Sequence, residues 1–116
     1  VSSNYNTPNT FIIGTLSTDE ELIPDEFALH QNFPNPFNPT TNIKFDLPSQ
    51  EKVNIVIFDV MGRNIRSLMN ENLNAGYHNI QWDAKNDLGE PVSAGMYIYI
   101  LHAGDHRSVK KMVLLK

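Results

Sequence analysis

Hydrophobic and polar residues alternate along several short runs of this chain. In residues 42–47 and 77–83, alternate side chains form two sets that would lie on opposite faces. This pattern is typical of strands that bury one face. No window keeps the period expected of an amphipathic helix. The buried faces would be formed by Ile43, Phe45 and Leu47 in the first run and by His78, Ile80 and Trp82 in the second.

Two further runs, at residues 53–58 and 96–101, are almost wholly apolar. For the first, this composition predicts a central strand that is covered on both faces. In the second, an inward-facing aliphatic set would turn Tyr97 and Tyr99 outward, where the tyrosine pair could bind a ligand. That aliphatic set is Met96, Ile98 and Ile100.

Turn signals separate these runs. Asp59 and Gly62 suit the two ends of a tight turn, because aspartate caps backbone amides and glycine accepts a positive φ. Other turns are expected at 74–76, 84–95 and 103–106, and other strands at 63–69 and 108–115. The fold class is therefore all-β, an immunoglobulin-like antiparallel β-sandwich of about six to eight strands. It has no disulfide, because the chain has no cysteine.

Residues 1–26 differ from the rest of the chain. Residues 1–10 have the composition of a loop, 11–15 form a short β-prone run, and 17–26 are acidic. Residues 1–26 contain five acids and no Lys or Arg. We expect a linker or the tail of a preceding domain there, and a separate domain at 27–116.

The composition of the 116 residues is that of a globular protein, and the formal net charge is -4. Residues 27–116 carry eight acids and nine bases, so a nucleic-acid partner is not expected. No apolar stretch is long enough to cross a membrane as a helix, so membrane insertion is not expected either. The chain begins with Val1, and we expect it to be a piece of a longer protein.

Few residues suggest chemistry. His102 and His106 flank a predicted turn and could lie close together, but two histidines without a third ligand are weak evidence for a metal. Asp83 and Asp87 lie in an oxygen-rich loop that could hold calcium, although such residues also cap turns through their own side chains. The capping interpretation is favoured, so these aspartates are only weak metal candidates. No catalytic residue and no cofactor is expected.

An ordered set of motifs narrows the class further. Residues 32–41 read NFPNPFNPTT, residues 43–48 read IKFDLP, and residues 53–63 read VNIVIFDVMGR. They are followed by LNAGYHNIQWDAKNDLGEPVSAGMYIYILHAG at 73–104 and KKMVLLK at 110–116. In order and spacing, the set resembles the C-terminal sorting domain (type A) of cargo proteins of the type IX secretion system. It is also similar to the related immunoglobulin-like domain of the flagellar hook-capping protein, and the resemblance covers residues 27–116.

This resemblance implies a secretion signal rather than an enzyme. Such domains lie at the C-terminus of secreted proteins of the Bacteroidetes and their relatives. The cargo, an upstream domain of the same chain, passes through the periplasm, and the outer-membrane translocon recognises the sorting domain. A sortase-like peptidase then commonly removes the domain and often joins the cargo to the cell surface. The expected location is the periplasm in transit and then the cell surface or the extracellular space.

Three features of the family match this chain and give the candidate residues for recognition by the translocon. They are a Pro-Asn-Pro sequence, a Gly-x-Tyr sequence and a lysine-containing last strand that a receptor could bind by edge pairing. We expect Phe33 and Phe37 to anchor the proline-rich segment. The candidates are Pro34, Asn35, Pro36, Gly95, Tyr97, Lys110, Lys111, Met112, Val113, Leu114, Leu115 and Lys116.

Two alternative functions remain open from the sequence. The first is an accessory module that binds carbohydrate or calcium, and it predicts affinity that is lost on Tyr99→Ala or Asp87→Ala. The second is a structural spacer, or a self-associating module, of a surface protein. It predicts that the last strand can be altered without any effect on secretion.

Overall fold

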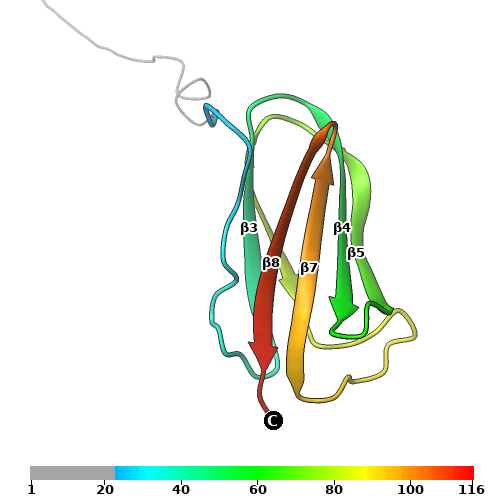
Figure 1. Ribbon diagram of the computed structural model, residues 1–116. Coiled ribbons are helices and arrows are strands. Elements are labelled where there is room, and N and C mark those ends of the chain that lie inside the picture. Colours follow the sequence, from blue (N-terminus) through cyan, green and yellow to red (C-terminus); the bar gives the residue numbers. More distant parts are fainter. Residues whose placement is uncertain (1–22) are drawn as a thin grey trace, which may run out of the picture.

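The structure, a computed structural model, describes residues 23–116 (Figure 1). The loop predicted at 1–10 and the β-prone run at 11–15 lie outside the described residues, as does most of the acidic segment at 17–26. The described part contains seven strands and no helix, which confirms the predicted all-β sandwich. The strands are β2 (Ala28–Leu29), β3 (Thr41–Leu47), β4 (Glu51–Asp59), β5 (Asn64–Leu73), β6 (Gly76–Trp82), β7 (Gly95–Ala103) and β8 (His106–Leu114).

The strands form two sheets that pack face to face. One sheet has the order β2-β3-β6 and the other has the order β5-β4-β7-β8, and all strand pairs are antiparallel. The hydrophobic core lies between the two sheets and draws on both of them. In the described residues, no helix is long and apolar enough to span a membrane.

The alternating runs face as predicted. In β3, Ile43, Phe45 and Leu47 have no exposed surface, and in β6 the same is true of Trp82. Trp82 lies at the centre of an aromatic cluster, with the ring of Phe37 at 5.8 Å. The period-two pattern therefore located both the strands and their buried faces.

The two apolar runs differ from the prediction. β4 buries Val53, Ile55 and Ile57 completely, but Val56 and Phe58 on its other face are only partly covered. The expectation that residues 53–58 are covered on both faces is wrong, because the four-stranded sheet is covered on its inner face only.

In β7, the tyrosines point inward and the aliphatic set points outward. This orientation is the opposite of the one that would expose a tyrosine pair. Tyr97 is 6% exposed and Tyr99 is 0% exposed, whereas Met96, Ile98 and Ile100 are on the outer face. The inner positions accept tyrosines because their hydroxyl groups find partners at the rim of the core. Tyr97 and Tyr99 therefore cannot form an exposed binding pair.

The segment before β3 is tied to the core through Tyr99. The Tyr99 hydroxyl donates to the His30 carbonyl at 2.7 Å and accepts the Asn32 amide at 2.8 Å. The buried Asn32 side chain donates to Thr41 Oγ1 at 3.0 Å. This polar cluster fixes the position at which the chain leaves the three-stranded sheet.

Phe37 and Phe33 are unequal, contrary to the expectation that both anchor the proline-rich segment. Phe37 is 2% exposed, whereas Phe33 is 77% exposed.

We predict that Phe37→Ala lowers the free energy of unfolding by roughly 3–5 kcal/mol, the usual cost of removing a buried phenylalanine. Phe33→Ala should change it by less than about 0.5 kcal/mol. Urea unfolding of both variants measures the difference, and equal losses would contradict this assignment.

Burial raises the pKa of Tyr99 to about 12, against a usual value of 10.0. The folded protein therefore keeps this proton at a pH where the unfolded chain releases it. We predict that the free energy of unfolding includes the full contribution of protonated Tyr99 below pH 10.0. It should fall as the pH rises towards about 12. Tyr99→Phe has no such proton and should show a smaller fall. Urea midpoints of both proteins at neutral and alkaline pH test this, and parallel curves would refute it.

Candidate functional site

The last strand, β8, is at the edge of the four-stranded sheet and pairs with β7 on one side (Figure 1). Met112 and Leu114 point into the core and are buried, whereas Lys111 is exposed. Lys110 takes a core-facing position opposite Tyr99 and is only partly buried. A charged residue that points inward on an edge strand discourages pairing with other chains. Leu115 and Lys116 follow the strand and are exposed.

Residues 33–37, which we call the strap, cover the C-terminal half of this edge. The Phe37 amide donates to the Val113 carbonyl at 3.0 Å, and the Phe37 carbonyl accepts the Leu115 amide at 2.9 Å. The Asn35 side-chain oxygen accepts the Val113 amide at 3.0 Å. The chain thus passes from pairing with β3 to pairing with β8, and it joins the two sheets along one side.

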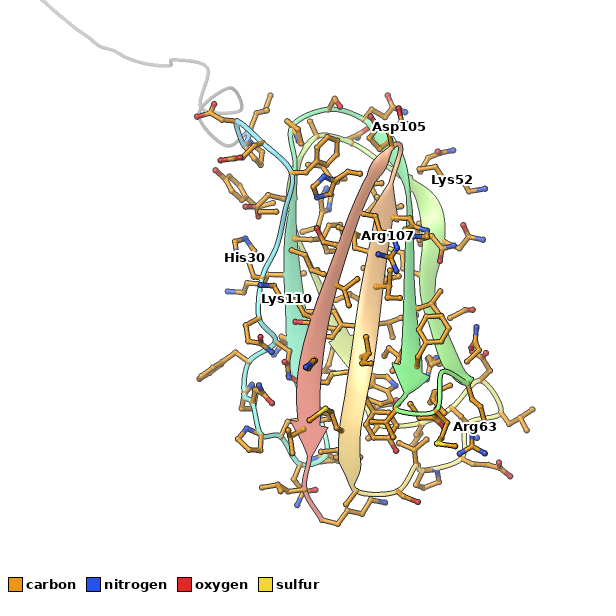
Figure 2. All side chains as sticks on the ribbon, in the orientation of Figure 1. His30, Lys52, Arg63, Asp105, Arg107 and Lys110 are labelled. Atoms are coloured by element: carbon orange, nitrogen blue, oxygen red, sulfur yellow. The ribbon has the colours of Figure 1, made fainter. Side chains whose placement is uncertain are left out.

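The N-terminal half of the same edge lies near β2, but no backbone hydrogen bond joins the two strands. Because the backbone groups of Val113 point towards the strap, those of every second residue, including Arg107 and Val109, also point away from β7. Lys111 fits this pattern, since its carbonyl accepts Gln31 Nε2 at 2.6 Å. Within residues 23–116, no group outside the β7–β8 ladder bonds to the backbone of Arg107 or Val109. Figure 2 shows Arg107 and Lys110 along β8.

The strap itself is held by side chains that the sequence analysis did not single out. The Pro34 carbonyl accepts Asn32 Nδ2 at 3.2 Å and Thr41 Oγ1 at 2.9 Å. Both donors are buried, with Asn32 2% exposed and Thr41 0% exposed. Their position beside a run of prolines was the available signal, because prolines lack amides and other groups must fix the backbone. The candidates Pro34, Asn35 and Pro36 are exposed.

Gly95 and Tyr97 are at the start of β7, which pairs with the end of β8. Gly95 has a φ of 146°, a backbone conformation that favours glycine. The Tyr97 hydroxyl donates to the Ser93 carbonyl at 2.5 Å, and its ring meets Trp82 edge-on at 5.5 Å. The Gly-x-Tyr motif therefore shapes the backbone beside Leu114.

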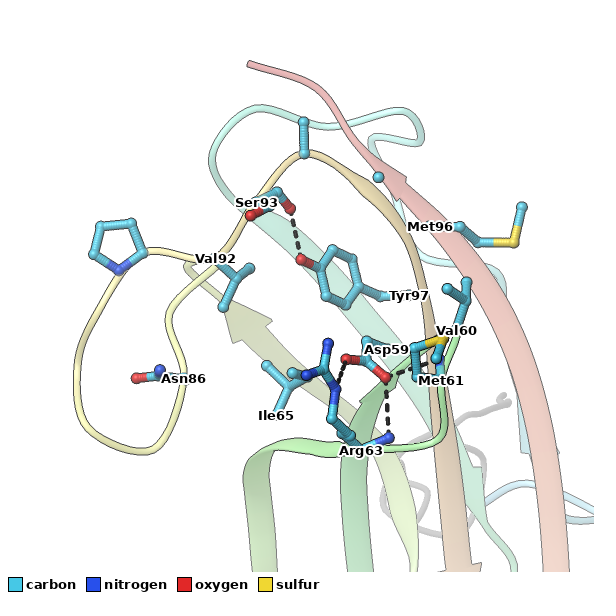
Figure 3. Close-up of a pocket in the computed structure, with 13 residues that line it drawn as sticks. Asp59, Val60, Met61, Arg63, Ile65, Asn86, Val92, Ser93, Met96 and Tyr97 are labelled. Carbon is cyan, nitrogen blue, oxygen red and sulfur yellow. Dashed lines mark hydrogen bonds and ion pairs between the residues drawn. The ribbon is translucent and has the colours of Figure 1, made fainter.

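A pocket of about 390 Å³ opens beside Tyr97, between the β4–β5 turn and the loop before β7 (Figure 3). Asp59 accepts the amides of Met61 and Arg63 at 2.9 Å, and it pairs with the Arg63 side chain at 2.8 Å. The Arg63 backbone amide contributes most to holding the pKa of Asp59 below its usual value. Burial, followed by the Asp59 charge, raises the pKa of Tyr97. Asp59 thus closes the turn rather than acting as a base.

The two histidines of the β7–β8 hairpin do not form a site. His102 is opposite Arg107, whereas His106 is opposite Ala103 and therefore belongs to the other face of the sheet. His106 stacks on Phe27 with ring centroids 4.9 Å apart. The expectation that His102 and His106 lie close together is therefore wrong.

The acidic loop residues bind protein groups. Asp83 Oδ1 is 3.5 Å from Arg66 NH1, and Asp87 Oδ1 accepts the Ser67 amide at 2.9 Å. Asn86 Oδ1 accepts the amides of Leu88 and Glu90 at 2.9 and 3.0 Å. Among residues 23–116, no group of three or more His, Cys, Asp or Glu side chains could hold a metal ion.

Three solved structures share the fold at low sequence identity. Latent dimeric PorU from Porphyromonas gingivalis is 20% identical, with a TM-score of 0.60 over 79% of this chain and 10% of that one. PorZ, a surface component of the type IX secretion system of the same organism, is 16% identical, with a TM-score of 0.51 over 79% of this chain and 12% of that one. The alkylpurine DNA glycosylase AlkC of Pseudomonas fluorescens is 14% identical, with a TM-score of 0.52 over 80% of this chain and 31% of that one. At these identities the likeness shows the fold alone.

The sequence itself identifies the family. Residues 31–115 match the family model of the secretion system C-terminal sorting domain, whereas no curated protein matches the chain. The match includes the strap and β3 to β8. Domains of this family are non-catalytic and act in secretion to the cell surface or the extracellular space. The chain therefore belongs to the secretion system C-terminal sorting domains, which are the sorting signals of the type IX secretion system.

Proposed function

We propose that this domain directs a cargo, located upstream in the same polypeptide, from the periplasm through the outer-membrane translocon, and that the translocon binds β8. The observation that carries this proposal is that, within residues 23–116, the N-terminal half of the β8 edge has backbone groups without hydrogen bonds, although β2 lies near it. The strap occupies the C-terminal half of the edge, and the outward backbone groups of Arg107 and Val109 remain available to another strand. An extended segment of a receptor can add to such an edge through main-chain hydrogen bonds.

The candidate residues of β8 then have different roles. Met112 and Leu114 are buried and hold the strand on the core, so they position the edge rather than contact the receptor. Lys111, Leu115 and Lys116 are exposed and can contact it directly. Lys110, which points inward at the open half, keeps this edge from pairing with other copies until the receptor binds.

The other candidates act through β8. Asn35 accepts the Val113 amide, and Pro34 and Pro36 flank Asn35 and fix the backbone on either side of it. Gly95 is opposite Leu114 in the ladder, and Tyr97 is opposite Met112. These five residues are positioning residues, because each holds the strand that the receptor binds.

Removal of the domain after export requires an accessible peptide bond upstream of the sandwich. Asp25 and Glu26 are exposed and precede β2, the first strand of the fold. An exposed segment outside a sheet is a suitable substrate for a peptidase. We therefore place the domain at residues 27–116 and the cut by a sortase-like peptidase within residues 17–26, before the cargo is attached to the cell surface.

An export assay tests the edge-pairing proposal. The full chain is fused behind a fluorescent passenger with an N-terminal signal peptide, in a host with a working type IX system. Val109→Pro removes an amide that faces the open edge, so the sheet should tolerate the change while an added strand cannot pair. We predict that the parent fusion reaches the surface and that Val109→Pro remains in the periplasm. Arg107→Pro, at the next outward position, should behave in the same way.

The matched control is Gln81→Pro. Asn42 exchanges backbone hydrogen bonds with Phe33, so the backbone of Gln81, opposite Asn42, faces the open edge of β6. This variant should be exported normally. Export of a folded Val109→Pro fusion, verified by urea unfolding, would reject edge pairing and leave the sorting function intact. Failure of the parent fusion would reject the sorting function itself.

The strap can be tested by hydrogen exchange. Because Asn35 accepts the Val113 amide, we predict that Asn35→Ala accelerates exchange of that amide by roughly three- to tenfold, as expected for a lost hydrogen bond. Asn38→Ala is the matched control, since within the described residues the Asn38 side chain makes no hydrogen bond. Unchanged exchange at Val113 in Asn35→Ala would show that the strap does not protect the edge.

A further inference from the structure

Phe33 is an aromatic ring without a packing role. It is 77% exposed, although Phe37, four residues later in the same motif, is buried. Its backbone pairs with Asn42 at the margin of the three-stranded sheet, and this pairing fixes the backbone from which the ring projects. An exposed aromatic ring beside polar groups can serve as a stacking platform.

Polar side chains surround this ring. Phe33, Gln31, Asn42, Lys44 and Asn79 line a hollow of about 380 Å³ on the outer face of the sheet. This volume is within the roughly 300–1,000 Å³ of small-ligand sites. Lys44 and Asn79 are directly opposite each other on β3 and β6, so the floor of the hollow is a paired and rigid part of the sheet.

These polar groups have unused hydrogen-bonding capacity. Within residues 23–116, the side chains of Asn42, Lys44 and Asn79 make no hydrogen bond and no ion pair. Each carboxamide offers a donor pair and an acceptor, and the lysine offers three further donors. The hollow therefore combines an apolar platform with donors and acceptors at fixed positions around it.

We propose that this hollow binds a saccharide, with a pyranose ring stacked on Phe33 and its hydroxyl groups bonded to Asn42, Asn79 and Lys44. A pyranose has an apolar C–H face and a rim of hydroxyl groups that both donate and accept, and this pattern is complementary to the hollow. Lys44 is the only charged residue among those that line it, so acidic sugars are favoured over neutral ones. This site lies beside the strap and shares Gln31 with the capped end of the β8 edge, but saccharide binding does not rest on export.

Other ligand classes fit the hollow less well. A peptide strand would need open backbone groups, which are at the edges of a sheet and not on its face. A nucleic acid would need clustered basic residues, whereas the hollow has one lysine and the chain has a net charge of -4. The platform with amide groups is best matched by a ligand rich in hydroxyl groups.

The test is an NMR titration of the ¹⁵N-labelled full chain with hexasaccharides of galacturonate, cellulose, chitin and maltose. We expect the galacturonate oligomer to shift the amides of Phe33, Asn42, Lys44 and Asn79 most strongly. Phe33→Ala should weaken this binding by about tenfold, as expected for loss of a stacking contact, and Phe33→Tyr should retain it. Asn79→Ala should also weaken it. Leu88→Ala removes another highly exposed apolar side chain in a different loop and should have no effect.

Each outcome decides the proposal. The proposal is supported if the chemical shift changes are centred on Phe33 and are lost when its ring is removed. It is overturned if none of the four oligosaccharides shifts these amides, if the shifts are elsewhere, or if Phe33→Ala binds as tightly as the parent. Urea unfolding of each variant, in which the exposed Phe33 and Asn79 should be well tolerated, separates a lost contact from a lost fold.

Discussion

The hydrogen bonds between Phe37 and β8 join the segment between β2 and β3 to the last strand, and the rest of the structure depends on this junction. An edge strand exposes unpaired backbone groups. Pairing of Phe37 with Val113 and Leu115 satisfies such groups along residues 113–115. The burial of Phe37 against Trp82 connects this pairing to the hydrophobic core.

The alternating runs were predictable because polar and apolar residues differ enough to select one face. In β3, the apolar side chains of Ile43, Phe45 and Leu47 determine which face of the strand is buried. The apolar runs carry no such contrast, and in β7 both faces are hydrophobic. Its orientation is decided by distant groups, since the hydroxyl of Tyr99 needs the backbone of His30 and Asn32, far away in sequence. A local pattern cannot contain that information.

In the candidate site too, some features were predictable from the sequence and others depend on the fold. The motifs identified the family, because their order and spacing are specific even where no single residue is. They did not distinguish Phe33 from Phe37, since both are aromatic residues beside proline, and only the path of the strap buries one and exposes the other. The bond from Val113 to Asn35 joins residues that are far apart in sequence, so it follows from the fold and not from a motif. Asn32 and Thr41 are close to Pro34 in sequence, but polar residues beside prolines are common in loops, so their burial was not predicted.

Under the proposed edge pairing, the junction also limits the part of β8 that a receptor strand can reach. A strand that adds to an edge of unlimited length can slide by two residues without changing which side chains face each way. Here Gln31, which precedes the strap, ends the unbonded edge at Lys111, because the Lys111 carbonyl already accepts Gln31 Nε2. In that proposal, a receptor strand pairs only with the part of β8 between the hairpin and Lys111. The contacts that cover the C-terminal half of the edge thus shorten the segment along which a receptor strand could slide.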